Sequence, residues 1–252
     1  MKYLLICLVL LFTSCGNIQE KVRNTFQTEN AKEIRNNYQK IIKLLSLYKS
    51  KLDKRNPKNY SIVLDRMLKE NIFNNENTIN LFSHKKNTTD NYTNYFEYAF
   101  DKEKIRKNRN DYLIIGLYKM FYFTYKMDVK HKMIALSYDL EHLQNTYKNL
   151  QVIQWKIKFD KSIDDKYLFL TWQKNWQIEL EKKLKNNQLE DILLGELSNI
   201  KSEEESLLDP SNNSFEIITA KMLLHVADSI KRLHAEPENL STEAILSFIF
   251  LI

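Results

Sequence analysis

Two Asp-x-x-His pairs are the side chains in this sequence whose types and spacing could hold a metal ion. Asp128 precedes His131, and Asp139 precedes His142 in the same way. On one continuous helix this spacing places both pairs along nearly one line, and rows of carboxylate and imidazole groups can bind transition metals. The same line lies about 120° from the apolar seam of that helix, on its polar flank. Two interpretations therefore stay open: solvated helix surface, and a metal site serving a metal-dependent hydrolase.

No other pattern in the sequence carries recognisable chemistry. The sequence lacks HExxH, GxSxG and a phosphate-binding glycine loop, the motifs of metalloproteases, α/β-hydrolases and P-loop NTPases. His225 lies among apolar residues, with Asp228 shortly after it. This setting is typical of a buried, hydrogen-bonded histidine, and a catalytic or pH-sensing role is the alternative. We therefore expect a protein that is not an enzyme and that holds no cofactor.

The elements that would position these side chains are expected to be helices. Glycine and proline number only three each, whereas β-sandwiches and βαβ folds need such turn residues at frequent intervals. The composition, 43% hydrophobic and 28% charged, is ordinary for a folded body. The prediction is an all-α fold, an irregular multi-helix bundle with long, coiled-coil-like helices.

The predicted helices follow the spacing of the apolar residues. The first carries a stripe at 3–4-residue spacing and ends before Pro57; the stripe consists of Ile34, Tyr38, Ile41, Leu45, Tyr48 and Leu52. The central helix, capped by Asp111, covers 112–150 and is apolar on nearly all sides in its first part, as in a buried helix. Further helices are expected at 61–73, 92–100, 172–184, 189–208, 213–235 and 244–252.

The segment 153–170 shows a different period. Ile153, Trp155, Ile157 and Phe159 alternate with polar residues, and 167–170 could return as a second strand. This alternation favours a small β-hairpin, and a kinked helical continuation is the alternative.

Three tryptophans form the candidate surface for a partner or ligand. Trp172 and Trp176 are one helical turn apart, and Trp155 lies in the preceding segment. Tryptophans on one stripe anchor a core when they are buried and mark a binding surface when they are exposed. Together with the aromatic residues at 121–125 they could instead line a cavity for an apolar ligand.

The charge of the chain is mildly basic. The formal net charge is +6, with acidic residues interleaved throughout. Such an excess favours an anionic membrane surface or an acidic partner and does not by itself indicate nucleic acid. A basic run from Lys102 to Arg109 is interpreted as a solvated helix end or loop, with phospholipid contact as the alternative.

The first residues have the order of an export signal. A positive Lys2 is followed by an apolar run at 4–12 and by small residues before Cys15. The apolar run is shorter than the roughly 20 residues that span a bilayer. Its end, the segment Phe-Thr-Ser-Cys-Gly at 12–16, resembles the lipobox of bacterial lipoproteins, although Phe12 stands where leucine is usual. The resemblance implies cleavage before Cys15, a diacylglycerol on its thiol and usually an acyl chain on its new amino group.

Three parts are expected: a signal peptide at 1–14, a polar tether at 15–30 and a single helical domain at 31–252. Cys7 leaves with the signal and Cys15 carries the lipid, so no disulfide is expected. An ordinary signal peptide with an incidental cysteine is the alternative.

The leading functional prediction is a lipid-anchored, non-enzymatic protein of the bacterial envelope that binds another protein. A scaffold role and an immunity or exclusion role are both compatible with it. Its expected partners are the membrane, through lipid on Cys15, and an unidentified protein, without nucleic acid. Gly16 in place of aspartate resembles lipoproteins sent to the outer membrane of two-membrane cells. A carrier or sensor of an apolar ligand is the alternative function.

Overall fold

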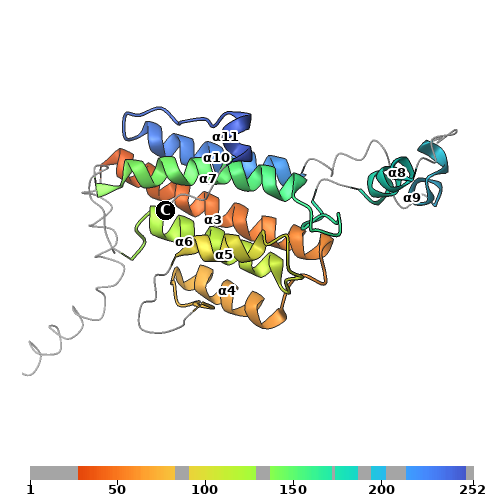
Figure 1. Cartoon of the computed structure of the whole chain (residues 1–252). Coiled ribbons are helices and arrows are strands. Elements are labelled where there is room, and N and C mark those ends of the chain that lie inside the picture. Colours follow the sequence, from red (N-terminus) through yellow and green to blue (C-terminus); the bar gives the residue numbers. More distant parts are fainter. Residues whose placement is uncertain are drawn as a thin grey trace, which may run out of the picture.

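The computed structural model describes residues 28–82, 91–128, 137–171, 174–186, 194–202 and 214–247, which form an all-α bundle (Figure 1). The helices are α3 (Glu29–Arg55), α4 (Ile62–Asn74), α5 (Tyr92–Ala99), α6 (Arg109–Thr124), α7 (Leu140–Phe159), α8 (Asn175–Lys185), η2 (Leu194–Glu196), α9 (Ser198–Lys201), α10 (Ser214–Lys231) and α11 (Thr242–Leu246). Within these ranges the predicted all-α, multi-helix bundle is confirmed.

The core lies between α3, α6, α7 and α10. All six residues of the predicted α3 stripe are buried, and α6 is buried on most of its sides, as its apolar sequence predicts. Helix α10 packs on both α3 and α7, and α5 packs on α6. Polar side chains join the packed helices: the Asn37 amide donates to Asp228 Oδ2 at 2.8 Å, and the hydroxyls of Tyr125 and Ser229 lie 3.0 Å apart.

Helix α5 approaches α6 closely at a glycine. A Cβ atom on Gly116 would lie 2.7 Å from Cε1 of Phe96 and 3.0 Å from Cβ of Tyr95. Glycine therefore lets two aromatic residues of α5 lie against the α6 backbone, and this contact fixes the spacing of the two helices.

The prediction of one helix over 112–150 is wrong. Helix α6 ends at Thr124, and Lys126 adopts a left-handed backbone conformation with φ 47°. A new helix, α7, begins after Asp139, whose carboxylate accepts hydrogen bonds from the backbone N–H groups of Glu141 and His142. The left-handed residue stops one helix and the Asp139 cap starts the next. Asp111 is not the cap of α6, because Asn108 holds that position.

The β-hairpin predicted near 153–170 is also wrong. Residues up to Phe159 belong to α7, and an isolated bridge between Lys161 and Tyr167 is the β-pairing found in the described residues. The alternating apolar residues are compatible with a helix, because they form two i,i+4 pairs on different sides of it. Ile153 and Ile157 are buried in the core, whereas Trp155 and Phe159 contact each other on the outer side, with ring centroids 5.3 Å apart.

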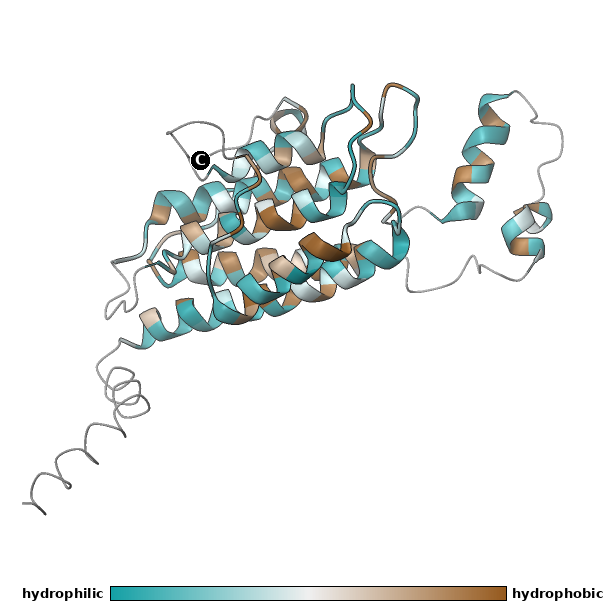
Figure 2. Cartoon of the chain, turned by 90° about the horizontal axis from the view of Figure 1, so that it is seen from below, coloured by the Kyte–Doolittle hydropathy of each residue, from teal (hydrophilic) through white to brown (hydrophobic). Residues whose placement is uncertain are grey.

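Helices α8 and α9 pack with η2 and stand to one side of the bundle (Figures 1 and 2). Glu181 of α8 joins them to the loop after α7, since it accepts a hydrogen bond from the Tyr167 hydroxyl at 2.6 Å and pairs with Lys161 at 3.1 Å. The prediction of one helix over 189–208 is wrong within the described residues, because Leu197 is extended and separates η2 from α9. Residues 189–193, 203–208 and 248–252 lie outside the described residues. Among the described helices, none combines the length and apolar character that crossing a membrane requires.

Candidate functional site

A groove between α3 and α4 is the candidate functional site. Its volume is about 390 Å³, within the range of small-molecule and peptide pockets. We call it the α3–α4 groove; its lining residues are Ser46, Lys49, Ser50, Asp53, Lys54, Pro57, Tyr60, Asp65, Leu68, Lys69 and Ile72. Pro57, Leu68 and Ile72 give the groove an apolar part, while hydroxyl and charged groups supply the rest of its lining.

The turn between α3 and α4 holds the groove open. Pro57 ends α3 at Asn56, and α4 then packs on α6. The Asn56 side chain is fixed by donating to the Leu170 carbonyl and accepting from the Leu170 N–H, each at 2.8 Å. At the other end of the turn, the Ser61 N–H donates to Asp111 Oδ2 at 2.6 Å. These bonds attach the turn to neighbouring elements, so the groove has a fixed shape.

A buried lysine joins the walls of the groove to α6. Lys49 is 4% exposed, and its Nζ lies 2.5 Å from Asp53, 3.2 Å from Asp65 and 3.1 Å from Asp111. Asp111 is fully buried, whereas Asp65 also pairs with Lys69 at the surface at 2.7 Å. The Asn110 amide donates to Asp53 at 3.0 Å. The four ionised groups therefore form one network that spans α3, α4 and α6.

Burial and charge shift the pKa values of this network in different directions. Burial opposes the charge of Lys49, but the carboxylates of Asp53 and Asp111 outweigh it and raise the Lys49 pKa. Burial raises the pKa of Asp111 even though Lys49 and the Ser61 N–H favour its ionised form. For Asp65, burial is outweighed by Lys69 and Lys49, so its pKa is lowered. The network keeps Lys49 charged, and Asp111 gains a proton more easily than an ordinary aspartate does.

The network suits binding better than proton transfer. Each carboxylate already accepts from Lys49 and from a second donor, so none is left without a partner to act as a general base. The rim of the groove carries the hydroxyl groups of Ser46 and Ser50 and the ammonium group of Lys54, which can hydrogen-bond to a bound segment of another protein. Polar groups beside an apolar floor can orient an amphipathic segment of a partner.

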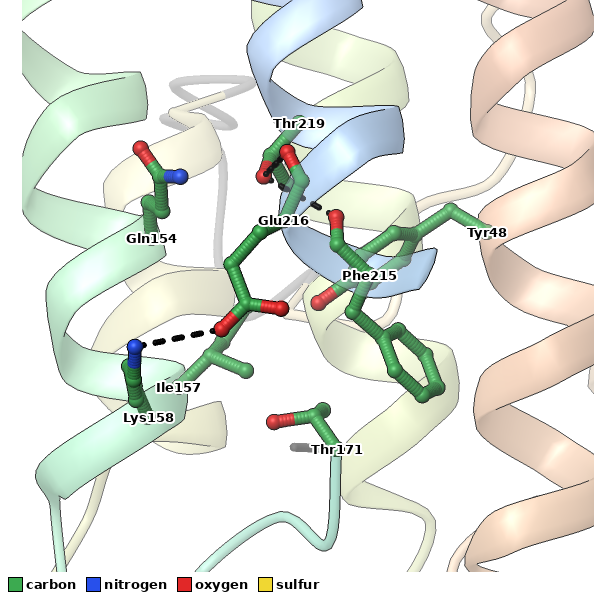
Figure 3. A pocket seen from close by; sticks show the side chains of 8 residues that line it. All are labelled: Tyr48, Gln154, Ile157, Lys158, Thr171, Phe215, Glu216 and Thr219. Atoms are coloured by element: carbon green, nitrogen blue, oxygen red, sulfur yellow. Dashed lines mark hydrogen bonds and ion pairs between the residues drawn. The ribbon is translucent and has the colours of Figure 1, made fainter. Parts of the chain in front are cut away.

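A second cavity, between α7 and α10, is too small for a ligand. Its volume is about 10 Å³, room for about one water molecule. Figure 3 shows Glu216 extending from α10 toward Lys158 of α7, to which its Oε1 is paired at 3.2 Å. The buried Oε2 atom has no hydrogen-bond partner among the described residues. Burial and the charge of Glu216 raise the pKa of Tyr48 in the same cavity, so its hydroxyl stays neutral.

The predicted metal ligands do not form one row on a helix. Asp128 is exposed after the end of α6, Asp139 caps α7, and His131 lies outside the described residues. His142 Nδ1 is 3.7 Å from Asp139 Oδ2, and its ring packs on Phe123 with centroids 4.9 Å apart. Among the described residues, no group of three or more His, Cys, Asp or Glu side chains is placed to hold a metal ion.

The predicted tryptophan surface is only partly described. Trp155 is half-buried on α7, Trp176 lies in the first turn of α8, and Trp172 lies outside the described residues, as does Cys15. The structure thus places Trp155 and Trp176 on different helices, while the stripe of Trp172 and Trp176 stays a prediction. Phe121 and Tyr125 are buried in the core, and neither of the two cavities above is lined by them or by a tryptophan.

His225 is half-buried on α10. Burial and then the positive charge of Lys40 lower its pKa, although Asp228 acts in the opposite direction. The histidine is thus largely neutral near pH 7.

Sequence reasoning missed the groove. The available signals were two i,i+4 pairs, Lys49 with Asp53 and Asp65 with Lys69, on either side of Pro57. Such pairs are common on solvated helices, and only the fold shows that Lys49 is buried and that Asp111 approaches it from α6.

Comparison with known proteins gives no further assignment of this site, since no family model, curated protein or solved structure matches the chain.

Proposed function

We propose that the chain is a lipid-anchored, non-enzymatic binding module of the bacterial envelope, and that the α3–α4 groove receives a segment of a partner protein. The observation that carries the binding role is the groove itself: a fixed depression of about 390 Å³ with apolar and hydrogen-bonding groups side by side. The partner is recognised by an amphipathic segment that places an apolar side chain on the half-buried Ile72, beside the fully buried Leu68, and polar groups against the serine rim.

The leader supports the anchored location. Its positive start, short apolar run and small residues before Cys15 fit a lipoprotein signal. Lipidation adds about 0.8 kcal/mol of membrane affinity per buried CH₂ group, and two or more chains hold a protein stably. Gly16 after the cysteine fits delivery to the outer membrane if the cell has two membranes.

The electrostatics of the groove support a role without catalysis. Lys49 and the three carboxylates satisfy one another, and Asp53 and Asp111 are further held by Asn110 and the Ser61 N–H. Such a network stabilises a shape more readily than it moves protons. A scaffold role and an immunity or exclusion role both need a fixed binding surface. The two roles differ in which protein is bound.

The anchor is tested by replacing Cys15 with serine in the full chain. We expect the unmodified protein to sediment with membranes and to carry the mass of its acyl chains, and the C15S variant to lose both properties. Membrane association and mass that are unchanged in the variant would reject the anchor.

The groove is tested by photo-crosslinking in cells that produce the natural partner. A crosslinking amino acid at Ser50, in the groove, is expected to give one defined adduct that is present in stoichiometric amount. The control position is Glu141, which is exposed on α7 outside the groove. Equal adducts from both positions, or none from Ser50, would remove the groove as the binding site.

A further inference from the structure

The outward sides of α3 and α10 form a surface that combines apolar side chains with lysines. Leu47 is 47% exposed, Ile217 is 51% exposed and Leu224 is 67% exposed. Lys40, Lys43 and Lys221 are exposed on the same two helices. We call this set of six residues the α3/α10 face.

These residues lie together because α3 and α10 pack as antiparallel neighbours. Tyr48 contacts Phe215 near one end, with ring centroids 5.3 Å apart, and Asn37 bonds to Asp228 near the other. Between these contacts, the positive charge of Lys40 lies close enough to His225 to lower the pKa of that histidine, after the larger effect of burial.

Helical spacing then sets the direction of the exposed side chains. Ile217, Lys221 and Leu224 follow one another at 3–4-residue spacing, on the side of α10 opposite its buried residues Met222 and Val226. Lys40 and Leu47 are seven residues apart on α3, two turns of the same helix side.

The face carries positive charge that the fold does not neutralise. Among the described residues, no carboxylate forms an ion pair with Lys40, Lys43 or Lys221. The nearest acids on α10 are engaged elsewhere, since Asp228 bonds to Asn37 and pairs with Arg232, and Glu216 pairs with Lys158 of α7. The face is therefore apolar and cationic, the combination that anionic lipid surfaces bind.

We propose that the α3/α10 face rests on the anionic headgroup surface of the membrane that carries the chain. This inference depends on the proposed function, because the anchor at Cys15 brings the face to the lipid. Whatever its conformation, a chain of the length from Cys15 to Thr28 can span at most roughly 40 Å. Leu47 lies roughly 27 Å along the axis of α3 from Glu29. The tether is thus long enough for α3 to lie flat on the surface.

The contact also orients the binding groove. Asp53, in the groove, lies about 120° around α3 from Leu47 at 3.6 residues per turn. Ser50 and Lys54 of the groove rim are three and seven residues from Leu47, so they lie nearer the face than Asp53 does. With the α3/α10 face on the lipid, the groove therefore borders the membrane contact, and a partner protein approaches it from the Asp53 side.

Fluorescent probes in the reconstituted lipoprotein test this contact. Because Cys7 leaves with the signal and the Cys15 thiol is acylated, I217C or L224C supplies a single reactive thiol for a polarity-sensitive dye. The vesicles contain phosphatidylcholine with phosphatidylglycerol, and some of their lipids carry brominated acyl chains. We expect several-fold stronger quenching at 217 and 224 than at the control F73C, which replaces a side chain 90% exposed on α4. Equal quenching at 73 and 224, or none at 224, overturns the proposal.

A charge variant supplies an independent measurement. K40E/K43E/K221E with the dye at 224 is expected to lose most of its quenching, whereas the equally charged control K58E/K107E/K182E, at exposed lysines elsewhere, keeps it. Loss in both variants would mean that only net charge matters and would overturn a specific face. A dye at 224 that is unquenched in vesicles yet shielded in native envelopes would identify an acidic protein as the occupant and reject lipid.

The same protein and vesicle preparations distinguish failure of the anchor from failure of the α3/α10 face. If mass measurement shows no acyl chain on Cys15, the proposed function fails. The unacylated chain, with Cys7 and Cys15 also replaced by serine so that the thiol at 224 or 73 alone takes the dye, is then mixed with the same anionic vesicles, where quenching at 224 above that at 73 still supports the face. An acylated protein without quenching at 224 leaves the anchor standing and removes the face.

Discussion

Replacing Lys49 with methionine tests whether the buried ion network holds the α3–α4 groove together. Methionine keeps an unbranched side chain of similar length and removes only the ammonium group. The carboxylates of Asp53, Asp65 and Asp111, now 2.5, 3.2 and 3.1 Å from Nζ, would then face one another without their shared cation. Breaking a buried ion pair by removing one partner costs about 3–5 kcal/mol of stability. For a chain of this size, we expect the Tm to fall by about 10 °C.

Urea unfolding followed by circular dichroism measures this loss and its dependence on pH. A folded-state pKa above the unfolded value means that the protonated form of Asp111 favours the folded state and that ionisation opposes folding as pH rises through the folded pKa. Without Lys49 this pKa rises further. The loss in K49M is therefore largest near pH 7 and shrinks toward pH 4. Adding D111N to K49M should recover at least about 1 kcal/mol, because the buried charge is then absent.

Lys69 provides the matched control. It pairs with Asp65 from the surface, where its side chain is 71% exposed, and K69M should cost under about 1 kcal/mol. If K49M is no more harmful than K69M at pH 7, or equally harmful at pH 4 and pH 7, the network does not hold the groove as described.

Three further predictions concern packing, pH and capping. G116A should destabilise the fold by about 1–3 kcal/mol despite alanine's higher helix propensity, because the new Cβ would lie 2.7 Å from Phe96; G195A, with open space around it, is the control in the same thermal-unfolding assay. Stability should fall steeply above pH 10, because burial raises the pKa of Tyr92 to about 12 and raises those of several other tyrosines, so they ionise more readily once unfolded; a pH series of unfolding free energies that stays flat to pH 11 contradicts this. D139A should cost about 1 kcal/mol through loss of the α7 cap, whereas D128A, at an exposed position, should cost less than half of that by urea unfolding.

The helices that could be predicted are those whose burial matches their apolar spacing. The stripe from Ile34 to Leu52 and the stop at Pro57 define α3 in the sequence and in the fold. The scarcity of glycine and proline correctly predicted the all-α class, because a helical bundle needs few turns. In these parts local preference and tertiary packing agree.

The errors arose where one apolar pattern fits two structures. Ile153 to Phe159 alternates as a strand would, yet the helix begun at Asp139 continues through it and buries alternate members of the pattern. The break after Thr124 depends on Lys126 taking a left-handed conformation. A lysine in the sequence does not indicate such a conformation, because non-glycine residues rarely adopt it. The groove escaped prediction because Lys49, Asp65 and Asp111 are far apart in sequence and meet only after the helices pack.

Three consecutive residues of α3 show how one helix can serve three surfaces. Successive side chains point about 100° apart, so Leu47 faces outward, Tyr48 packs on Phe215 in the core and Lys49 enters the ion network beneath the groove. Burial of Tyr48 and Lys49 fixes the rotation of α3 about its axis, and the direction of Leu47 follows from it. In the proposed arrangement, the core packing that fixes this rotation would also set which side of α3 is turned toward the membrane.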